Sequence, residues 1–268
     1  MQNASTVYPT DLTDAEWQVL QPLLPPPAPR GRPRERDLRV ILNGLFYLLR
    51  AGCAWRMLPV DFGPWSTVHD YYRRWRLTGL WPQLNATLRE RVRQGAGKAA
   101  EPSAAILDSQ SIKTGDQACA SGYDAGKKIE GRKRHVVVDT LGLLLHVVVG
   151  PASVQDRDGA RPVLQAVLAR FARLRKIWAD AGYAGALVAW FQERAGTRDC
   201  VLEIVRRLGD QVGFQILPKR WIVERTLGWM VKSRRLARDY ETATQSSEAM
   251  IYLTLIRLML KRLAKAKN

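Results

Sequence analysis

The sequence predicts an α/β protein in which a region of helices precedes a mixed sheet flanked by helices. Apolar positions recur at helical spacing through the first third of the chain. After residue 104, short apolar and β-branched runs alternate with helical segments, the pattern of an α/β core. A stretch rich in Gly, Ala and Lys lies between the two patterns and is typical of a linker. We therefore expect a helical region at 1–94, a linker at 95–103 and an α/β region at 104–268.

Four helices are expected in the N-terminal region from apolar periodicity and from capping residues. Thr10 or Thr13 is expected to cap the first, Gly52 to end the second and Ser66 to cap the third. Their expected ranges are 13–24, 35–50, 66–77 and 81–93.

The α/β region contains four runs that predict strands, two of them joined as a hairpin through residues 139–142. The expected strands are 104–108, 133–138, 143–149 and 177–180, with a further one at 201–205. The expected helices are 162–175, one from 185, 221–238 and 247–265.

The composition indicates a folded protein that meets a polyanion. The chain has 268 residues, 42 of them Lys or Arg against 25 Asp or Glu, a formal net charge of +17. An apolar fraction of 46% argues against a disordered basic tail. Lys and Arg that neutralise phosphates release condensed counterions, so nucleic acid is the expected partner. A basic surface that serves solubility alone is the alternative.

Other features exclude several classes of protein. Three cysteines are too few and too scattered for a disulfide scaffold or a zinc cluster. No signal peptide is recognised at the start, and the longest apolar stretch, 141–149, is too short to cross a membrane. We expect a soluble cytoplasmic protein with no membrane partner.

Three acids stand out by their placement. Asp108 and Asp180 each end a predicted strand, and Glu224 lies in a predicted helix. Acids at the carboxyl ends of neighbouring strands project into the crevice where α/β sheets bind ligands. Three carboxylates together need cations, and hard oxygen ligands suit Mg²⁺ or Mn²⁺. Taken singly, each is as well explained as a turn, cap or salt-bridge residue.

Other acids have simpler interpretations. Asp139 fits the hairpin turn. Asp156 and Asp158 follow a strand end and fit a helix cap, although they are also the second choice for the second metal-binding acid.

Several separate motifs in order resemble the DDE transposases of bacterial insertion sequences, in the insertion sequence family five branch. The resemblance covers nearly the whole chain, from about Tyr8 to the final helix. The N-terminal motifs are Leu12-Thr-Asp-Ala-Glu-Trp17, Gly31-Arg-Pro-Arg34, Ala51-Gly-Cys-Ala-Trp-Arg56 and Thr67-Val-His-Asp-Tyr-Tyr-Arg-Arg-Trp75. The later motifs are Leu107-Asp-Ser-Gln-Ser-Ile-Lys113, Gly131-Arg-Lys-Arg-His135, Asp180-Ala-Gly-Tyr183 and Val223-Glu-Arg-Thr226.

The resemblance implies a ribonuclease-H-like catalytic domain behind a helix-turn-helix-like DNA-binding domain. By motif, Asp108, Asp180 and Glu224 become the catalytic acids and the ligands of two Mg²⁺ or Mn²⁺ ions. Two such ions, about 3.5–4 Å apart, clamp the attacking and leaving oxygens of a phosphodiester. The implied substrate is double-stranded DNA at the element ends and at the target, cut and joined by at least a dimer that associates with the nucleoid. A metal-dependent nuclease on the same fold and a non-catalytic DNA-binding protein remain alternatives.

The chain departs from a signature, Tyr-x2-Arg-x3-Glu-x6-Lys, that related transposases often carry around the last acid. Arg220 and Glu224 match it, whereas Leu217 stands in the Tyr position and Val231 in the Lys position. On one continuous helix, Arg220 and Arg235 would flank Glu224 and Lys232 would be offset by about 80°. We expect these three basic residues to hold DNA phosphates beside the acids.

The remaining expected DNA contacts are basic residues in three places. An Arg-rich loop resembles a minor-groove hook, with a stiff interhelix linker as the alternative. The helix at 66–77 could enter a groove or be an amphipathic surface helix, and the basic run after Asp108 could follow the phosphates or be a solvated turn. These residues are Arg30, Arg32, Arg73, Arg74, Arg76, Lys127, Lys128, Arg132, Lys133 and Arg134.

Overall fold

The computed structural model describes residues 8–27, 36–205 and 219–266 of the chain. The strands are β1 (Ala104–Lys113), β2 (Gly122–Asp124), β3 (Ile129–Asp139), β4 (Leu144–Pro151), β5 (Lys176–Asp180) and β6 (Val201–Val205). The α-helices are α1 (Asp14–Leu20), α2 (Leu38–Ala51), α3 (Trp65–Leu77), α4 (Leu80–Gly95), α5 (Asp156–Arg170), α6 (Ala186–Ala195), α7 (Arg220–Val231), α8 (Arg234–Ala237) and α9 (Thr244–Lys265). Short 3₁₀ helices lie at η1 (Gln21–Leu23), η2 (Trp55–Met57), η3 (Val60–Phe62) and η4 (Ala181–Tyr183).

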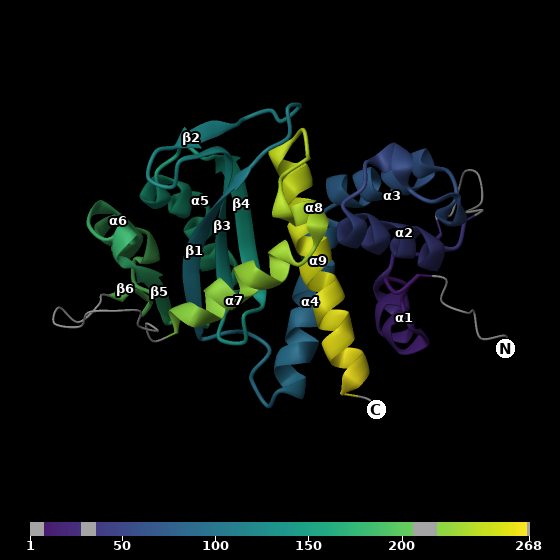
Figure 1. Ribbon diagram of the computed structural model, residues 1–268. Coiled ribbons are helices and arrows are strands. Elements are labelled where there is room, and N and C mark those ends of the chain that lie inside the picture. The colour runs from purple at the N-terminus through teal and green to yellow at the C-terminus, as the bar shows by residue number, and fades with distance from the viewer. Residues whose placement is uncertain (1–7, 28–35, 206–218, 267–268) are drawn as a thin grey trace.

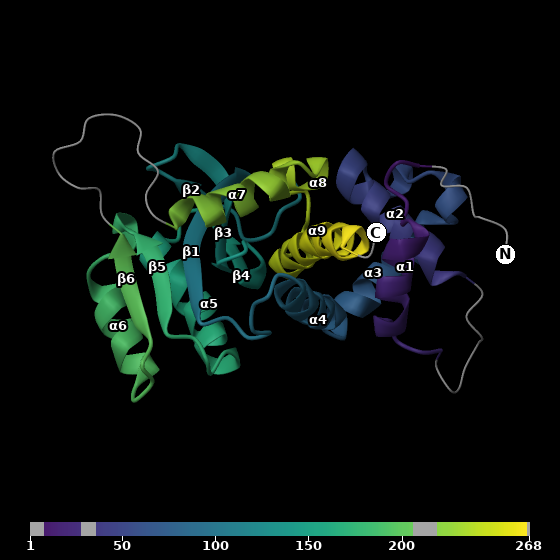
Figure 2. The same ribbon diagram turned by 90° about the horizontal axis from the view of Figure 1, so that it is seen from below.

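The strands form one mixed sheet in the order β2-β3-β1-β5-β6, with β4 also paired to β3. β1 and β3 are antiparallel, β3 and β4 form the predicted hairpin, and β1, β5 and β6 are parallel. In Figures 1 and 2 helices lie on both faces of this sheet, and the N-terminal helices lie to one side. The predicted fold class, a mixed sheet flanked by helices and preceded by a helical region, is confirmed.

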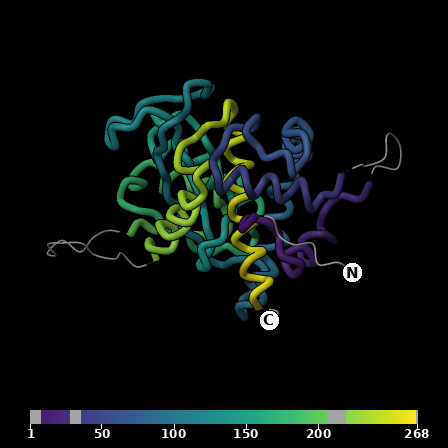
Figure 3. The backbone as a smooth tube through the Cα atoms, turned by 45° about the vertical axis from the view of Figure 1, so that its right-hand side comes forward, coloured from purple at the N-terminus to yellow at the C-terminus, as the bar shows by residue number. Residues whose placement is uncertain are grey.

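The two sheet faces belong to two different cores, because successive residues of a strand point to opposite faces. On one face Val137 and Leu145 pack with the apolar side chains of α5 and α6. On the other face Val136 and Leu144 pack with α4, α7 and α9, and this core continues into α1, α2 and α3. Figure 3 shows the C-terminal helix beside the N-terminal segment, and α1 contacts α9.

Several predicted helix ends are confirmed. The Thr13 side chain accepts a hydrogen bond from the Glu16 backbone N–H, and the Glu16 side chain accepts one from the Thr13 N–H, which completes a capping box. Gly52 ends α2 in the left-handed conformation, with φ of 72°. Asp139 accepts hydrogen bonds from the N–H groups of Leu141 and Leu143 and so closes the hairpin turn.

Other expectations about elements are wrong. Pro64, not Ser66, precedes the first turn of α3. α5 begins at Asp156 rather than at the expected position 162, so Asp156 and Asp158 lie in its first turn. Their negative charges interact favourably there with the positive end of the helix dipole. The helix expected at 221–238 ends at Val231, because Ser233 adopts an extended backbone before α8 begins. Among the described helices, none is both long and apolar enough to cross a membrane.

Candidate active site

Parallel pairing of β1 with β5 brings two of the acids to the same place. Ala104 pairs with Lys176 and Ile106 with Trp178, so Asp108 and Asp180 follow in equivalent positions on the same face. The expectation that Asp108 ends its strand is wrong, since β1 continues to Lys113 along β3. Pairing with β5 nevertheless stops before Asp108, which opens the sheet edge beside it.

Helix α7 supplies the third acid from above this sheet face. α7 contacts β1, β3 and β5 and carries both Arg220 and Glu224. The Arg220 Nη2 atom lies 3.3 Å from Glu224 Oε1, 3.5 Å from Asp180 Oδ2 and 4.0 Å from Asp108 Oδ2. Three segments that are far apart in the sequence thus gather three carboxylates around one guanidinium nitrogen.

The three acids of this cluster differ in their surroundings. The side chain of Asp108 is 12% exposed, against 29% for Asp180 and 51% for Glu224, so the cluster opens to solution on the α7 side. Burial raises the pKa of Asp108 to about 6, and the charge of Asp180 adds to the rise. The nearby charges of Arg220 and Lys127 oppose it.

Backbone groups fix the orientation of the two strand acids. Asp108 Oδ1 accepts a hydrogen bond from the Ser109 N–H at 2.7 Å. Asp180 Oδ1 accepts one from the Gly182 N–H at 2.8 Å as it caps η4. A Cβ at Gly182 would lie 3.0 Å from that carboxylate oxygen, so glycine keeps this close approach open. The free Oδ2 atom of each acid points to Arg220.

The donor set of this cluster fits a hard divalent cation. Carboxylate oxygens are preferred by Mg²⁺ and Mn²⁺, and three carboxylates facing one guanidinium leave negative charge uncompensated. Within residues 8–27, 36–205 and 219–266, no three acidic, His or Cys side chains are already spaced to ligate one ion. Arg220 lies between the carboxylates, so an ion there requires its guanidinium to move aside.

A second polar cluster lies behind Asp108 on the opposite face of the sheet. The Ser109 hydroxyl donates to Asp156 Oδ1 at 2.9 Å, and Lys133 Nζ lies 3.0 Å from the same oxygen. The buried phenol of Tyr183 is close enough to Asp108 and Asp156 for both charges to raise its pKa, which burial already places well above the usual value. Asp156, the second choice from sequence, is therefore separate from the cluster around Arg220.

Seven of the predicted DNA contacts are accessible or partly accessible, and one of them is Arg220 at the acid cluster. Arg73 and Arg74 are exposed on α3, at the opposite end of the molecule from α6 in Figure 1, whereas Arg76 is half-buried. Lys127 and Lys128 are exposed in the turn between β2 and β3, and Lys232 is exposed at the end of α7. Arg30 and Arg32 lie outside the described residues.

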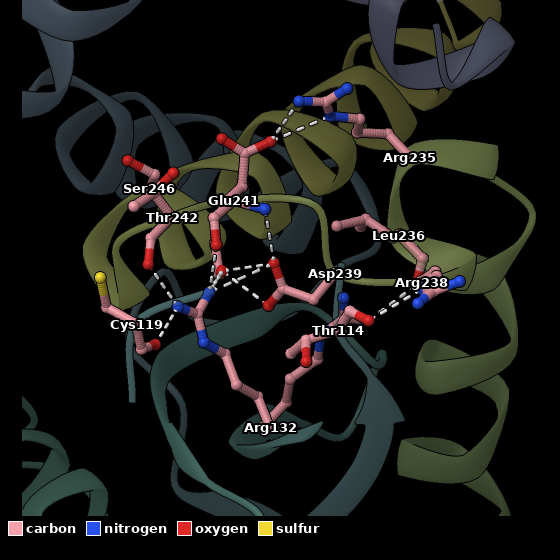
Figure 4. A network of polar contacts seen from close by, with 12 residues as sticks. Thr114, Cys119, Arg132, Arg235, Leu236, Arg238, Asp239, Glu241, Thr242 and Ser246 are labelled. Atoms are coloured by element: carbon pink, nitrogen blue, oxygen red, sulfur yellow. Dashed lines mark hydrogen bonds and ion pairs between the residues drawn. The ribbon is translucent and has the colours of Figure 1, made fainter. Parts of the chain in front are cut away.

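Three basic residues of the run after Asp108 are buried, so the expectation that they contact DNA is wrong. They lie within β3 rather than in a loop. Arg132 is fully buried and donates to the carbonyls of Cys119, Glu241 and Thr242 and to Ser247 Oγ (Figure 4). Arg134 is also fully buried and donates to the Leu236 carbonyl. Lys133, which is 4% exposed, pairs with Asp124 and Asp156.

Arg235 is likewise an internal residue rather than a DNA contact. The break before α8 removes it from the helix of Glu224 and turns it inward. Its guanidinium donates twice to Glu241 Oε1, at 2.9 and 2.7 Å (Figure 4). It also donates to the Cys53 carbonyl. A guanidinium held in this way cannot also reach a phosphate.

Two parts of the site were not predicted from sequence. The Ser109 N–H holds Asp108, while the Ser109 hydroxyl and Lys133 contact Asp156 on the opposite face, an arrangement that needs the β1–β3 register to be seen. The central position of Arg220 also depends on the packing of α7 across β1 and β5. The only indication of Arg220 in the sequence was its position four residues before Glu224, as in the transposase signature.

Two family models match the chain. One, described as "Putative transposase of IS4/5 family", matches residues 12–85. The other, described as "Transposase DDE domain", matches residues 99–259 and so covers all three acids of the cluster.

Curated relatives come from insertion elements. The chain is 34% identical over 108 residues to "Insertion element IS402 uncharacterized 16.2 kDa protein" of Burkholderia cepacia, covering 38% of this chain and 72% of that protein. It is 28% identical over 131 residues to "Putative transposase for insertion sequence element IS402" of the same organism, covering 46% of this chain and 60% of that protein. No solved structure matches the chain at a significant level.

Proposed function

Because the chain belongs to the DDE transposases, we propose that it binds the terminal inverted repeats of its own insertion sequence and catalyses metal-dependent DNA cleavage and strand transfer. The observation that carries this proposal is the convergence of Asp108, Asp180 and Glu224 on one nitrogen of Arg220. Three carboxylates beside an otherwise basic surface suit the binding of metal ions next to a phosphodiester.

Asp108, Asp180 and Glu224 are proposed to hold two Mg²⁺ or Mn²⁺ ions through their carboxylate oxygens. Bound ions would activate the attacking water or 3′-hydroxyl and stabilise the leaving oxygen. Asp108 has to be ionised to act as a ligand, and a pKa of about 6 leaves it ionised at neutral pH. The backbone bonds to Asp108 Oδ1 and Asp180 Oδ1 keep both carboxylates oriented.

Basic residues around the acids are proposed to hold the DNA. Arg220 can pair with a phosphate once it leaves the carboxylates, because its side chain is 22% exposed at the start of α7. Lys127 lies near enough to Asp108 to act on its charge, and the exposed Lys128 follows it in the same turn. Arg73 and Arg74 on α3 belong to the proposed reader of the element ends. Joining two element ends to one target requires at least a dimer.

A strand-cleavage and strand-transfer assay on labelled element ends tests this function. The proposal predicts free 3′-ends and joined products in Mg²⁺, and neither product in EDTA. Cleavage without joined products would indicate a nuclease. Binding of the ends with no cleavage in either Mg²⁺ or Mn²⁺ would indicate a non-catalytic DNA-binding protein.

A further inference from the structure

A groove on the surface is lined by residues from the C-terminal ends of α2 and α7 and from the middle of α9. Figure 1 shows where these helices lie. Its volume is about 550 Å³, and a neighbouring hollow of about 370 Å³ shares Arg50 and Lys232 with it. We call the two together the α2–α7–α9 groove. Its floor is apolar and includes Phe46 and Trp229.

Every charged residue that lines the α2–α7–α9 groove is basic. Arg257 is compensated, because its Nη1 atom lies 2.6 Å from Glu16 Oε2. The exposed side chains of Lys232, Arg234 and Lys261 have no ion-pair or hydrogen-bond partner among the described residues. The groove therefore carries a concentration of unneutralised positive charge.

The cations of the groove lie close enough to repel Lys261. Partial burial lowers the pKa of Lys261, and the charges of Arg257 and Arg50 lower it further. Glu16 opposes the shift but already pairs with Arg257. An anionic partner would relieve this repulsion, and the sharing of Arg50 and Lys232 by two adjoining hollows suits an extended anion.

The groove and the acid cluster lie along the same helix. Lys232 follows Glu224 by eight residues, a rise of about 12 Å at 1.5 Å per residue. That distance equals roughly three to four base pairs of duplex at 3.4 Å each. We propose that the α2–α7–α9 groove binds the phosphate backbone of duplex DNA three to four base pairs from the phosphate that is cut. This inference rests on the proposed function.

The test compares full-length proteins with two charge-neutralising changes in different places. The groove variant is Lys232→Gln/Lys261→Gln. The matched control is Lys98→Gln/Arg194→Gln, which removes the same charge from two exposed residues outside the groove. DNA binding is measured by fluorescence anisotropy in EDTA from low to high salt, with unfolding curves to confirm that both variants remain folded.

The groove variant is expected to bind element-end duplex roughly tenfold more weakly, with a log–log salt slope smaller by about 2, because each lost phosphate contact lowers the slope by about 0.9. The control is expected to keep the wild-type slope. Phosphate ethylation interference should mark positions three to four base pairs from the cut in the wild type and in the control, but not in the groove variant.

Equal log–log salt slopes of DNA binding for the groove variant and the wild type would overturn the groove assignment. The proposed function would still stand if the wild type cleaved element ends in Mg²⁺. If the groove variant bound inorganic pyrophosphate more weakly than the wild type but bound DNA equally well, the groove would be assigned to a small anion instead. Absence of both DNA binding and cleavage in the wild type would remove the proposed function, and this inference with it.

Discussion

At the scale of single residues, Arg220 is a cation placed among carboxylates that are proposed to bind metal. Its Nη2 atom lies within 4.0 Å of all three acids, so a divalent ion competes with it. Arg220→Gln is expected to bind Mn²⁺ roughly tenfold more tightly than the wild type, since removing a nearby unit charge corresponds to about 1.4 kcal/mol.

Electron paramagnetic resonance titration at pH 8 measures this affinity for Mn²⁺ without requiring activity. Alkaline pH keeps Asp108 ionised even though losing Arg220 raises its pKa further. Lys219→Gln is the matched control, because the neighbouring side chain is exposed and makes no ion pair with the acids. Unchanged or weaker Mn²⁺ binding by Arg220→Gln would show that the guanidinium does not compete with the ion.

His135 should make stability depend on pH. Burial lowers the pKa of its imidazole to about 4, and a Cβ added at Gly159 would lie 2.0 Å from its Nε2 atom. The unfolded chain takes up this proton below about pH 6.5 while the folded chain does not, so stability is retained above pH 6.5 and lost as the pH falls towards 4.

His135→Gln is expected to reduce the fall in the free energy of unfolding over this pH range by roughly 3 kcal/mol, which is the free-energy equivalent of the difference between the unfolded and folded pKa values of His135. Urea unfolding at intervals between pH 7 and pH 4 measures it. A variant with the same pH dependence as the wild type would exclude His135 as the source.

The candidate acids could be predicted because their positions relative to the predicted strands and helix are visible in the sequence. Asp108 and Asp180 each follow a short apolar run, and their equivalent positions on parallel strands are what brings them together. The contacts of Ser109 and Lys133 with Asp156 could not be predicted, because they depend on which residues of β1 and β3 pair. The assignment of catalytic roles to the acids stays a prediction.

At the scale of elements, β3 is an internal strand whose basic residues organise the C-terminal segment. Arg132 joins β3 to the chain around Asp239 and Thr242 through four hydrogen-bond acceptors, and it also donates to the Cys119 carbonyl (Figure 4). Arg132→Leu is expected to reduce the free energy of unfolding by about 3–5 kcal/mol, because it leaves Asp239 buried beside unsatisfied carbonyls.

Urea denaturation followed by circular dichroism measures the loss, with Lys127→Leu as the control because Lys127 is exposed in the preceding turn. A loss below about 1 kcal/mol, the range of a surface substitution, would contradict the anchoring role of Arg132.

A run of basic residues gave no information about which of them face solvent. Arg132 and Arg134 are buried by segments that arrive a hundred residues later, so local charge density was a poor guide. The hairpin and the helix ends at Thr13 and Gly52 were predictable because their signals are local. The break between α7 and α8 could not be predicted, because residues 231–234 include no Pro or Gly and the helical spacing of apolar residues continues across them.

At the scale of the whole molecule, helices from both ends of the sequence share one core. α9 packs against α1, α2, α3 and α4 as well as β4. Arg257 of α9 also pairs with Glu16 of α1. The division into regions 1–94 and 104–268 stays a prediction, and sequence alone could not show that the last helix joins them.

The net charge of +17 is distributed unevenly with respect to the proposed chemistry. Several cations face inward and stabilise the fold, namely Arg132, Lys133, Arg134 and Arg235. Exposed cations flank the acid cluster at Lys127 and the groove at Lys232 and Lys261. The basic composition thus serves internal anchoring as well as the proposed binding of DNA.

The central claim is that Asp108, Asp180 and Glu224 act together in metal-dependent DNA cleavage. The most direct measurement is the rate of element-end cleavage in Mg²⁺ by Asp108→Asn, Asp180→Asn, Glu224→Gln and Asp156→Asn, all confirmed as folded and able to bind DNA. The first three are expected to lose roughly 100-fold or more, because each removes a charged group proposed to bind metal, while Asp156→Asn loses far less. Near wild-type cleavage by any of the first three, or loss in Asp156→Asn with retention in Asp180→Asn, would contradict the claim.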